Sequence, residues 1–128
     1  MWHKRSRDGS GKCDVIATSN QADVVWGVIF EIPTAEKPAL DLAEGLGSGY
    51  AEKEVEVTMT RINVMASLYF ATSSDPSLRP YDWYKAFVVD GAREHGLPRE
   101  YITALETVPE KPDDDPERRA ANEALLQT

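Results

Sequence analysis

The stretch "ALDLAEGLGSGYAEKEVEV", residues 39–57, combines an apolar helical run, a glycine-rich turn and an alternating strand pattern. The helical run continues a pattern that covers residues 34–44, and Gly45 is a typical helix stop. Residues 52–60 alternate apolar and polar side chains, as a half-buried strand does. The sequence therefore predicts a helix, a tight turn and a strand in succession, with Glu44 in the last turn of the helix.

Other segments predict further strands and helices, which together give an α+β pattern. The segments 13–19, 24–32 and 63–72 are rich in β-branched and aromatic residues and predict three more strands. The tetrapeptide "TRIN", residues 60–63, is the expected hairpin connection. Two further helices are predicted to begin near Pro80 and at Pro98.

Two residues support the predicted start of the first helix. Thr34 is a plausible N-cap for the first helix, and Pro38 is tolerated near its first turn.

We expect one folded domain over residues 1–108. Residues 109–128 are acidic and Pro-rich, which predicts a linker and a short frayed helix capped by Asp115.

Composition limits the possible functions. The chain has 128 residues, 41% hydrophobic and 28% charged, which suits a single globular domain. Its net charge of −8 disfavours a nucleic-acid partner, because phosphate binding requires a basic face. Cys13 is the single cysteine, and no apolar run is long enough to cross a bilayer. We expect a cytoplasmic protein without a membrane partner.

The sequence shows no metal-ligand spacing and no glycine-rich phosphate loop, so no metal and no cofactor are expected. Glu44 is the most distinctive candidate for chemistry. At a helix C-terminus the negative end of the dipole favours its protonated form, and partial burial would act in the same direction. Such a group can take and return a proton. The alternative is an exposed glutamate before a glycine cap, which is commonplace and which periodicity alone favours.

Three segments carry a resemblance to a known family. "VVWGVIFEIP", "PALDLAEGLGSGYAEKEVEV" and "PSLRPYDWYKAFVVDGAREHGLPREYITAL" resemble, in that order, segments of the gamma-glutamylcyclotransferase-like family. The similarity extends over residues 4–105. It implies an α+β fold in which a small mixed β-barrel surrounds a pocket and helices flank it.

The resemblance also implies an activity. A gamma-glutamyl amino acid or amine would be cyclised to 5-oxoproline with release of the amine, and Glu44 would be the general acid/base. The same resemblance implies substrate-binding roles for Tyr50 and Tyr84, with Gly45 and Gly49 bringing the backbone of the turn close to the substrate. For each tyrosine, the alternative is a packed ring with its hydroxyl at the surface.

One departure from the family keeps a second hypothesis open. Family members typically begin with a strand that carries a Tyr-Gly-Ser-Asn motif, which this sequence does not contain. We therefore expect the first strand of the barrel to be absent and an edge beside residues 13–19 or 24–32 to be open. The alternative function is a non-catalytic or truncated relative, a small-molecule binding or oligomerising module, with a homodimer as the possible assembly.

Overall fold

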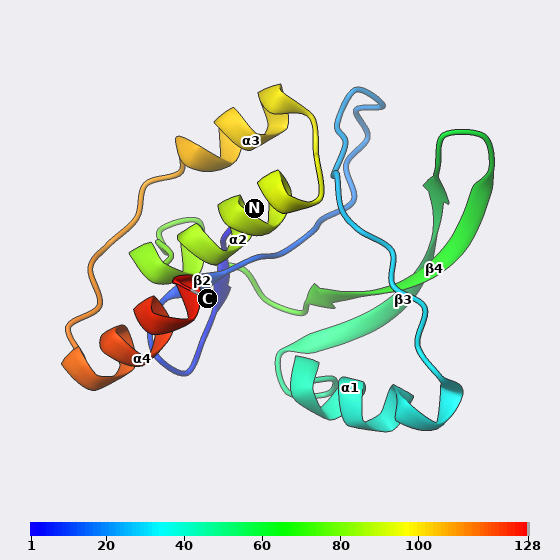
Figure 1. Ribbon diagram of the computed structural model, residues 1–128. Helices are drawn as coiled ribbons and strands as arrows, with labels where there is room; N and C mark the ends of the chain where they lie inside the picture. Colours follow the sequence, from blue (N-terminus) through cyan, green and yellow to red (C-terminus); the bar gives the residue numbers. More distant parts are fainter. Residues whose placement is uncertain (128) are drawn as a thin grey trace.

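The computed structural model describes residues 1–127 and consists of a helical half and a hairpin half (Figure 1). No helix in this part of the chain has the length and apolar composition needed to cross a bilayer. The elements, in chain order, are β1 (Lys4–Arg5), β2 (Gly11–Lys12), the 3₁₀ helix η1 (Thr34–Glu36), α1 (Lys37–Glu44), β3 (Tyr50–Thr58), β4 (Asn63–Ala71), α2 (Asp82–Glu94), α3 (Arg99–Glu106) and α4 (Pro116–Leu126).

The hairpin half follows the sequence pattern closely. α1 ends at Glu44 as expected, with Gly45 in the left-handed conformation at φ 78°. β3 and β4 pair antiparallel from Tyr50 opposite Ala71 to Thr58 opposite Asn63. The predicted cap at the helix start is wrong, because Thr34 lies inside the 3₁₀ turn and no side chain caps it.

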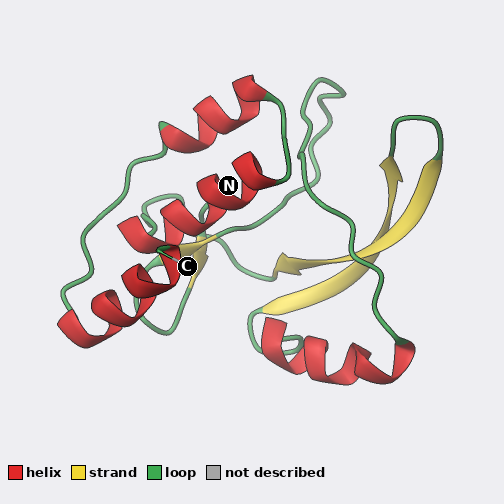
Figure 2. Ribbon diagram, in the orientation of Figure 1, coloured by secondary structure: helices red, strands yellow, loops and turns green. Residues whose placement is uncertain are grey.

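The prediction of strands at residues 13–19 and 24–32 is also wrong. Both segments run as irregular chain, and residues 1–127 contain two separate two-stranded sheets rather than a closed barrel (Figure 2). The physical reason is that an apolar pattern specifies a surface that favours burial, whereas a strand also requires a backbone partner. The side chains of Val24 and Phe30 are consequently 69% and 73% exposed.

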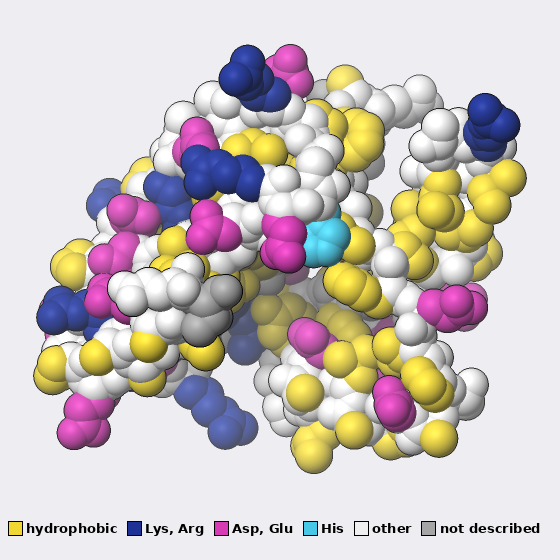
Figure 3. Space-filling model, in the orientation of Figure 1, with side chains coloured by type: hydrophobic (Ala, Val, Ile, Leu, Met, Phe, Trp, Pro, Cys, Tyr) yellow, Lys and Arg dark blue, Asp and Glu magenta, His cyan; other side chains and the backbone are white. Residues whose placement is uncertain are grey.

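Exposed apolar side chains occur both in the segment 24–32 and in the hairpin half. Apolar side chains gather over α1 and the β3–β4 hairpin, whereas charged side chains concentrate over the helical half (Figure 3). Leu42 on α1 is 84% exposed and Met65 on β4 is 62% exposed. The hairpin half therefore has little apolar burial of its own.

The core lies in the helical half, where the N-terminal hairpin packs against α2. Its buried apolar side chains are Trp2, Tyr81, Trp83, Val89 and Ala92. The amine of Lys12 lies 4.4 Å from the Tyr84 ring centroid and 4.8 Å from that of Trp83. A Cβ at Gly11 would lie 2.2 Å from the carbonyl oxygen of Trp2, so this close approach requires glycine.

The C-terminal segment is attached to α2 by a buried carboxylate. Asp113, whose side chain is 0% exposed, accepts hydrogen bonds from the Trp83 indole at 2.8 Å and from two nitrogens of the Arg118 guanidinium at 2.6 and 2.8 Å. The hydrogen bonds from Arg118 hold the pKa of Asp113 well below its usual range. Asp115 caps α4 as predicted, by accepting from the Arg118 amide at 3.0 Å. α4 is thus tied to α2, whereas the sequence suggested a frayed helix.

We expect Asp113→Ala to lower the melting temperature by ~5 °C or more, because the substitution leaves the Trp83 indole without its acceptor and Arg118 without its carboxylate. The measurement is thermal unfolding followed by circular dichroism at pH 7. Asp114→Ala removes the neighbouring exposed carboxylate and is the matched control. Equal melting temperatures for the two variants would contradict the role of Asp113.

The loss of stability caused by Asp113→Ala should depend on pH. The folded state favours the charged form of Asp113, because its pKa there is lowered. Its contribution to the free energy of unfolding is therefore fully present above the pKa of the unfolded state, about 3.9, and is lost as the pH falls toward the lowered pKa. The difference in stability between wild type and Asp113→Ala should therefore shrink below pH 4.

Candidate active site

Glu44 is placed by the turn that follows α1. It is the last residue of the helix, and its side chain is exposed, which is the placement that periodicity alone favours for a glutamate before a glycine cap. The left-handed conformation of Gly45 reverses the chain, and the Leu46 amide donates to the carbonyl oxygen of Asp41 at 2.9 Å. This closure returns the backbone to Tyr50, the first residue of β3, so that Glu44 and Tyr50 lie close to each other.

Glu44, Tyr50 and Tyr84 line one pocket of about 530 Å³. Tyr84 comes from α2 in the helical half, and the other two residues come from the hairpin half. The remaining lining is mostly apolar and includes Trp2, Val15, Val25, Trp26, Val28, Phe30, Val88, Leu97, Tyr101 and Leu105. The pocket is thus an apolar space with a few polar groups, the usual character of a small-molecule site.

The two glycines that the family resemblance suggested as binding residues, Gly45 and Gly49, form the turn itself. Both have positive φ, 78° and 106°. A Cβ at Gly49 would lie 3.1 Å from Cε of Lys4. Neither glycine is among the residues that line the pocket. In this structure they therefore shape the connection between Glu44 and Tyr50.

The main chain of Cys13 joins the two halves through the tyrosines of the pocket. The Tyr50 hydroxyl donates to the carbonyl oxygen of Cys13 at 3.0 Å, and the Cys13 amide donates to the Tyr84 hydroxyl at 3.1 Å. Burial raises the pKa of Tyr50 to about 12, with a smaller contribution from the Glu44 charge, and burial also raises the pKa of Tyr84. Both phenols are therefore neutral near pH 7 and available for hydrogen bonding.

The sequence did not single out two other polar residues of the pocket, Tyr69 and Asp14. Tyr69 lies opposite Glu52 in the hairpin register, on the same sheet face as Tyr50. The predicted hairpin implied this placement, since residues two apart in a strand share a face. Asp14 is buried and accepts a hydrogen bond from the Ala71 amide at 2.9 Å, a contact that no local pattern indicates.

Cys13 also lines the pocket, and its thiol is largely buried. Burial raises its pKa, so that it is protonated near neutral pH. A buried, protonated thiol of this kind acts as a small apolar side chain rather than as a nucleophile.

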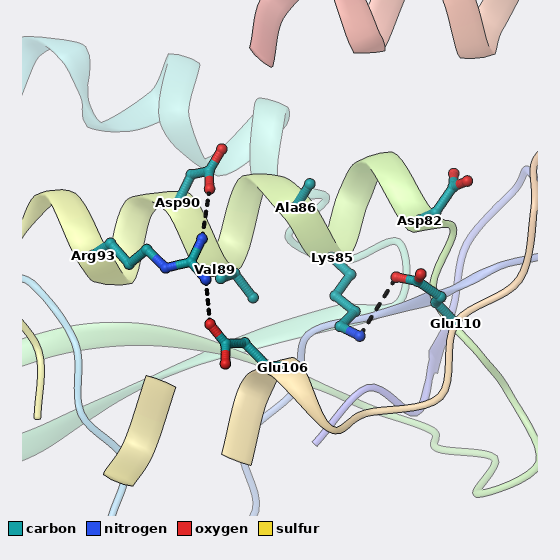
Figure 4. A pocket seen from close by; sticks show the side chains of 8 residues that line it. All are labelled: Asp82, Lys85, Ala86, Val89, Asp90, Arg93, Glu106 and Glu110. Carbon is teal, nitrogen blue, oxygen red and sulfur yellow. Dashed lines mark hydrogen bonds and ion pairs between the residues drawn. The ribbon is translucent and has the colours of Figure 1, made fainter. Parts of the chain in front are cut away.

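A second pocket of about 310 Å³ lies between α2 and α3 (Figure 4). Its charged groups bind one another: Lys85 lies 3.5 Å from Glu110, and Arg93 pairs with Asp90 at 3.4 Å and with Glu106. Within residues 1–127 no group of three or more His, Cys, Asp and Glu side chains is arranged to hold a metal ion. The pocket beside Glu44 is therefore the candidate active site.

Comparison with known proteins identifies the family to which the chain is similar. A model of the AIG2-like family matches residues 24–105. The human gamma-glutamylcyclotransferase is 33% identical over 96 residues, and the bovine protein of the same name is 32% identical over 87 residues. These matches cover 73% and 67% of this chain but 51% and 46% of the two relatives, so the chain spans about half the length of the curated relatives it matches.

Solved structures extend the similarity to nearly the whole chain. A structure named gamma-glutamyl cyclotransferase superposes with a TM-score of 0.79 at 27% identity, covering 95% of this chain and 72% of the other. A human protein described as uncharacterized superposes with a TM-score of 0.78, also at 27% identity, covering 96% of this chain and 72% of the other.

The geometry of the turn yields a stability prediction. Gly45→Ala should lower the free energy of unfolding by about 1 kcal/mol, because a Cβ is strained in the left-handed region even though no atom crowds it closely. Urea unfolding monitored by circular dichroism measures the change. Gly27→Ala is the matched control, since the φ angle of Gly27 is outside that region and its surroundings are open. Equal losses in both variants would contradict a special requirement at Gly45.

Proposed function

The chain belongs to the AIG2-like family, and on this premise we propose that it cyclises a gamma-glutamyl amino acid or amine to 5-oxoproline and releases the amine. The similarity to proteins named gamma-glutamylcyclotransferase supports this proposal. The single observation that carries it is the placement of Glu44, Tyr50, Tyr69 and Tyr84 around one pocket. The cytoplasmic location expected from the single cysteine is part of the same proposal.

In the proposed reaction the α-amine of the gamma-glutamyl group attacks its own γ-carbonyl carbon. A C–N bond forms to close the five-membered ring, and the C–N bond to the leaving amine breaks. Glu44 removes a proton from the attacking nitrogen and delivers a proton to the leaving nitrogen. Since no electrons are gained or lost, the reaction consumes no redox equivalents.

The pocket would accelerate this reaction mainly by holding the substrate in a folded-back conformation. Well-oriented intramolecular reactions reach effective molarities on the order of 10⁵ M or more. Tyr50 and Tyr84, both neutral and anchored on Cys13, can hydrogen-bond the polar groups of the substrate. The apolar lining would exclude water from the reacting atoms.

We expect Glu44→Gln to lower the rate of 5-oxoproline release by ~10² to 10⁴, because glutamine retains the volume of the side chain but cannot transfer a proton. The melting temperature should hardly change, since Glu44 is exposed. Glu36→Gln removes an exposed carboxylate just before α1 and is the control. Near-normal turnover by the Glu44→Gln variant would exclude Glu44 as the catalyst.

A second candidate function is the non-catalytic module that oligomerises, and the exposed segment 24–32 favours it. This segment is apolar and belongs to no strand in the described structure. Its residues Val24 and Phe30 are largely exposed. A homodimer that covers the segment would remove this apolar surface from water.

Light scattering tests this candidate. We expect a dimer mass for the wild-type chain and a monomer mass for Val24→Glu, whose charge would be buried in the interface. Ser19→Glu adds the same charge outside the segment and should leave the dimer intact. A monomeric wild-type chain that releases 5-oxoproline would eliminate this candidate.

A further inference from the structure

Four polar side chains connect α1 to both strands of the hairpin. The amine of Lys37 bonds the carboxylates of Asp41 and Glu52, and the Tyr69 hydroxyl donates to Oδ1 of Asp41 at 2.5 Å. Lys37 and Asp41 are one helical turn apart on α1, and Glu52 on β3 lies directly opposite Tyr69 on β4. We call Lys37, Asp41, Glu52 and Tyr69 the helix–hairpin cluster.

This cluster sets the orientation of α1 and therefore of Glu44. No residue of α1 is buried, so apolar packing contributes little to the position of the helix. Figure 1 shows α1 lying alongside the start of β3, where the cluster is formed. Glu44 is three residues after Asp41 and thus lies near it on the helix surface. The same bonds that hold α1 also bring Tyr69 into the lining of the pocket that contains Glu44.

The cluster also fixes the direction in which the Tyr69 hydroxyl donates. The hydrogen bonds from Lys37 and Tyr69 lower the pKa of Asp41, and the hydrogen bond to Asp41 raises the pKa of Tyr69. At neutral pH Asp41 is therefore a carboxylate, which only accepts, and Tyr69 is a neutral phenol, which must donate its single proton. The Lys37 amine also donates a hydrogen bond to the Tyr69 oxygen, which uses one of its two lone pairs. With the hydroxyl proton directed to Asp41, the remaining lone pair can only accept a hydrogen bond from a bound molecule.

We propose that Tyr69 binds the α-amine of a gamma-glutamyl substrate by accepting an N–H hydrogen bond, and that Asp41 is the positioning residue that makes Tyr69 an acceptor. This inference rests on the proposed function. The α-amine carries several N–H groups, so one can bond Tyr69 while another faces Glu44. The cluster has one cation and two carboxylates, a net charge of −1, which attracts a protonated amine.

Binding measurements on an inactive background separate this role from turnover. In Glu44→Gln protein, gamma-glutamylalanine should remain intact during calorimetry. Its analogue glutarylalanine has the same skeleton but lacks the α-amine. We expect a further Tyr69→Phe substitution to weaken binding of gamma-glutamylalanine about tenfold and to leave binding of glutarylalanine unchanged. Asp41→Asn should act in the same direction, because an amide can also donate and no longer fixes the hydroxyl.

The control is Glu54→Gln, which removes an exposed carboxylate from the same face of β3. It should change neither affinity. Equal weakening of both ligands by Tyr69→Phe, or no weakening of either, would overturn the inference while leaving the proposed function intact. Binding of neither ligand, together with no 5-oxoproline release by the wild-type chain, would overturn both.

The role of Asp41 has an independent readout that needs no substrate. Ultraviolet titration of the phenols in wild type and in Tyr69→Phe isolates the Tyr69 transition by difference. Asp41→Asn should lower the pKa of Tyr69, since it removes the charge that holds the hydroxyl proton. An unchanged Tyr69 transition in Asp41→Asn would contradict the positioning role.

Discussion

The left-handed turn at Gly45 is the constraint on which the candidate site depends. It ends α1 immediately after Glu44 and returns the chain to Tyr50 at the start of β3. Because β3 then pairs with β4 in a continuous register, the position of Tyr69 follows from that of Tyr50. One backbone conformation thus brings together groups from a helix and two strands, in a half of the molecule with little apolar burial.

Among the four tyrosines that line the pocket, Tyr50, Tyr69 and Tyr84 differ in what their hydroxyl groups can do. Tyr50 donates to the carbonyl oxygen of Cys13 and Tyr69 donates to Asp41, so their oxygens can accept from a ligand. Tyr84 accepts from the Cys13 amide, so its own proton can be donated. A ligand with both an amine and carbonyl or carboxylate oxygens, such as a gamma-glutamyl compound, matches this combination of acceptors and donors.

The sequence predicted those parts of the fold that depend on neighbouring residues. α1, its glycine cap and the β3–β4 hairpin each follow from periodicity and turn residues within about twenty positions. Strands at 13–19 and 24–32 were predicted from composition, but strand formation depends on a distant partner that composition does not specify. The bond between Trp83 and Asp113 joins residues 30 positions apart, and no pattern in either segment indicates it.

The two halves of the molecule meet at the main chain of Cys13, and this contact determines how Tyr84 lies relative to Glu44. The carbonyl oxygen of Cys13 bonds Tyr50 from the hairpin half, and its amide bonds Tyr84 from the helical half. Both bonds use backbone atoms of Cys13, and its thiol adds a side-chain hydrogen bond with Tyr84. Residues 13–33 form no strand in the described structure. These two hydrogen bonds therefore contribute more to the alignment of the helical half with the hairpin half than they would in a paired sheet. The position of Glu44 therefore depends on Lys37 and Asp41, which hold α1. The position of Tyr84 relative to Glu44 depends on the hydrogen bonds of the Cys13 main chain.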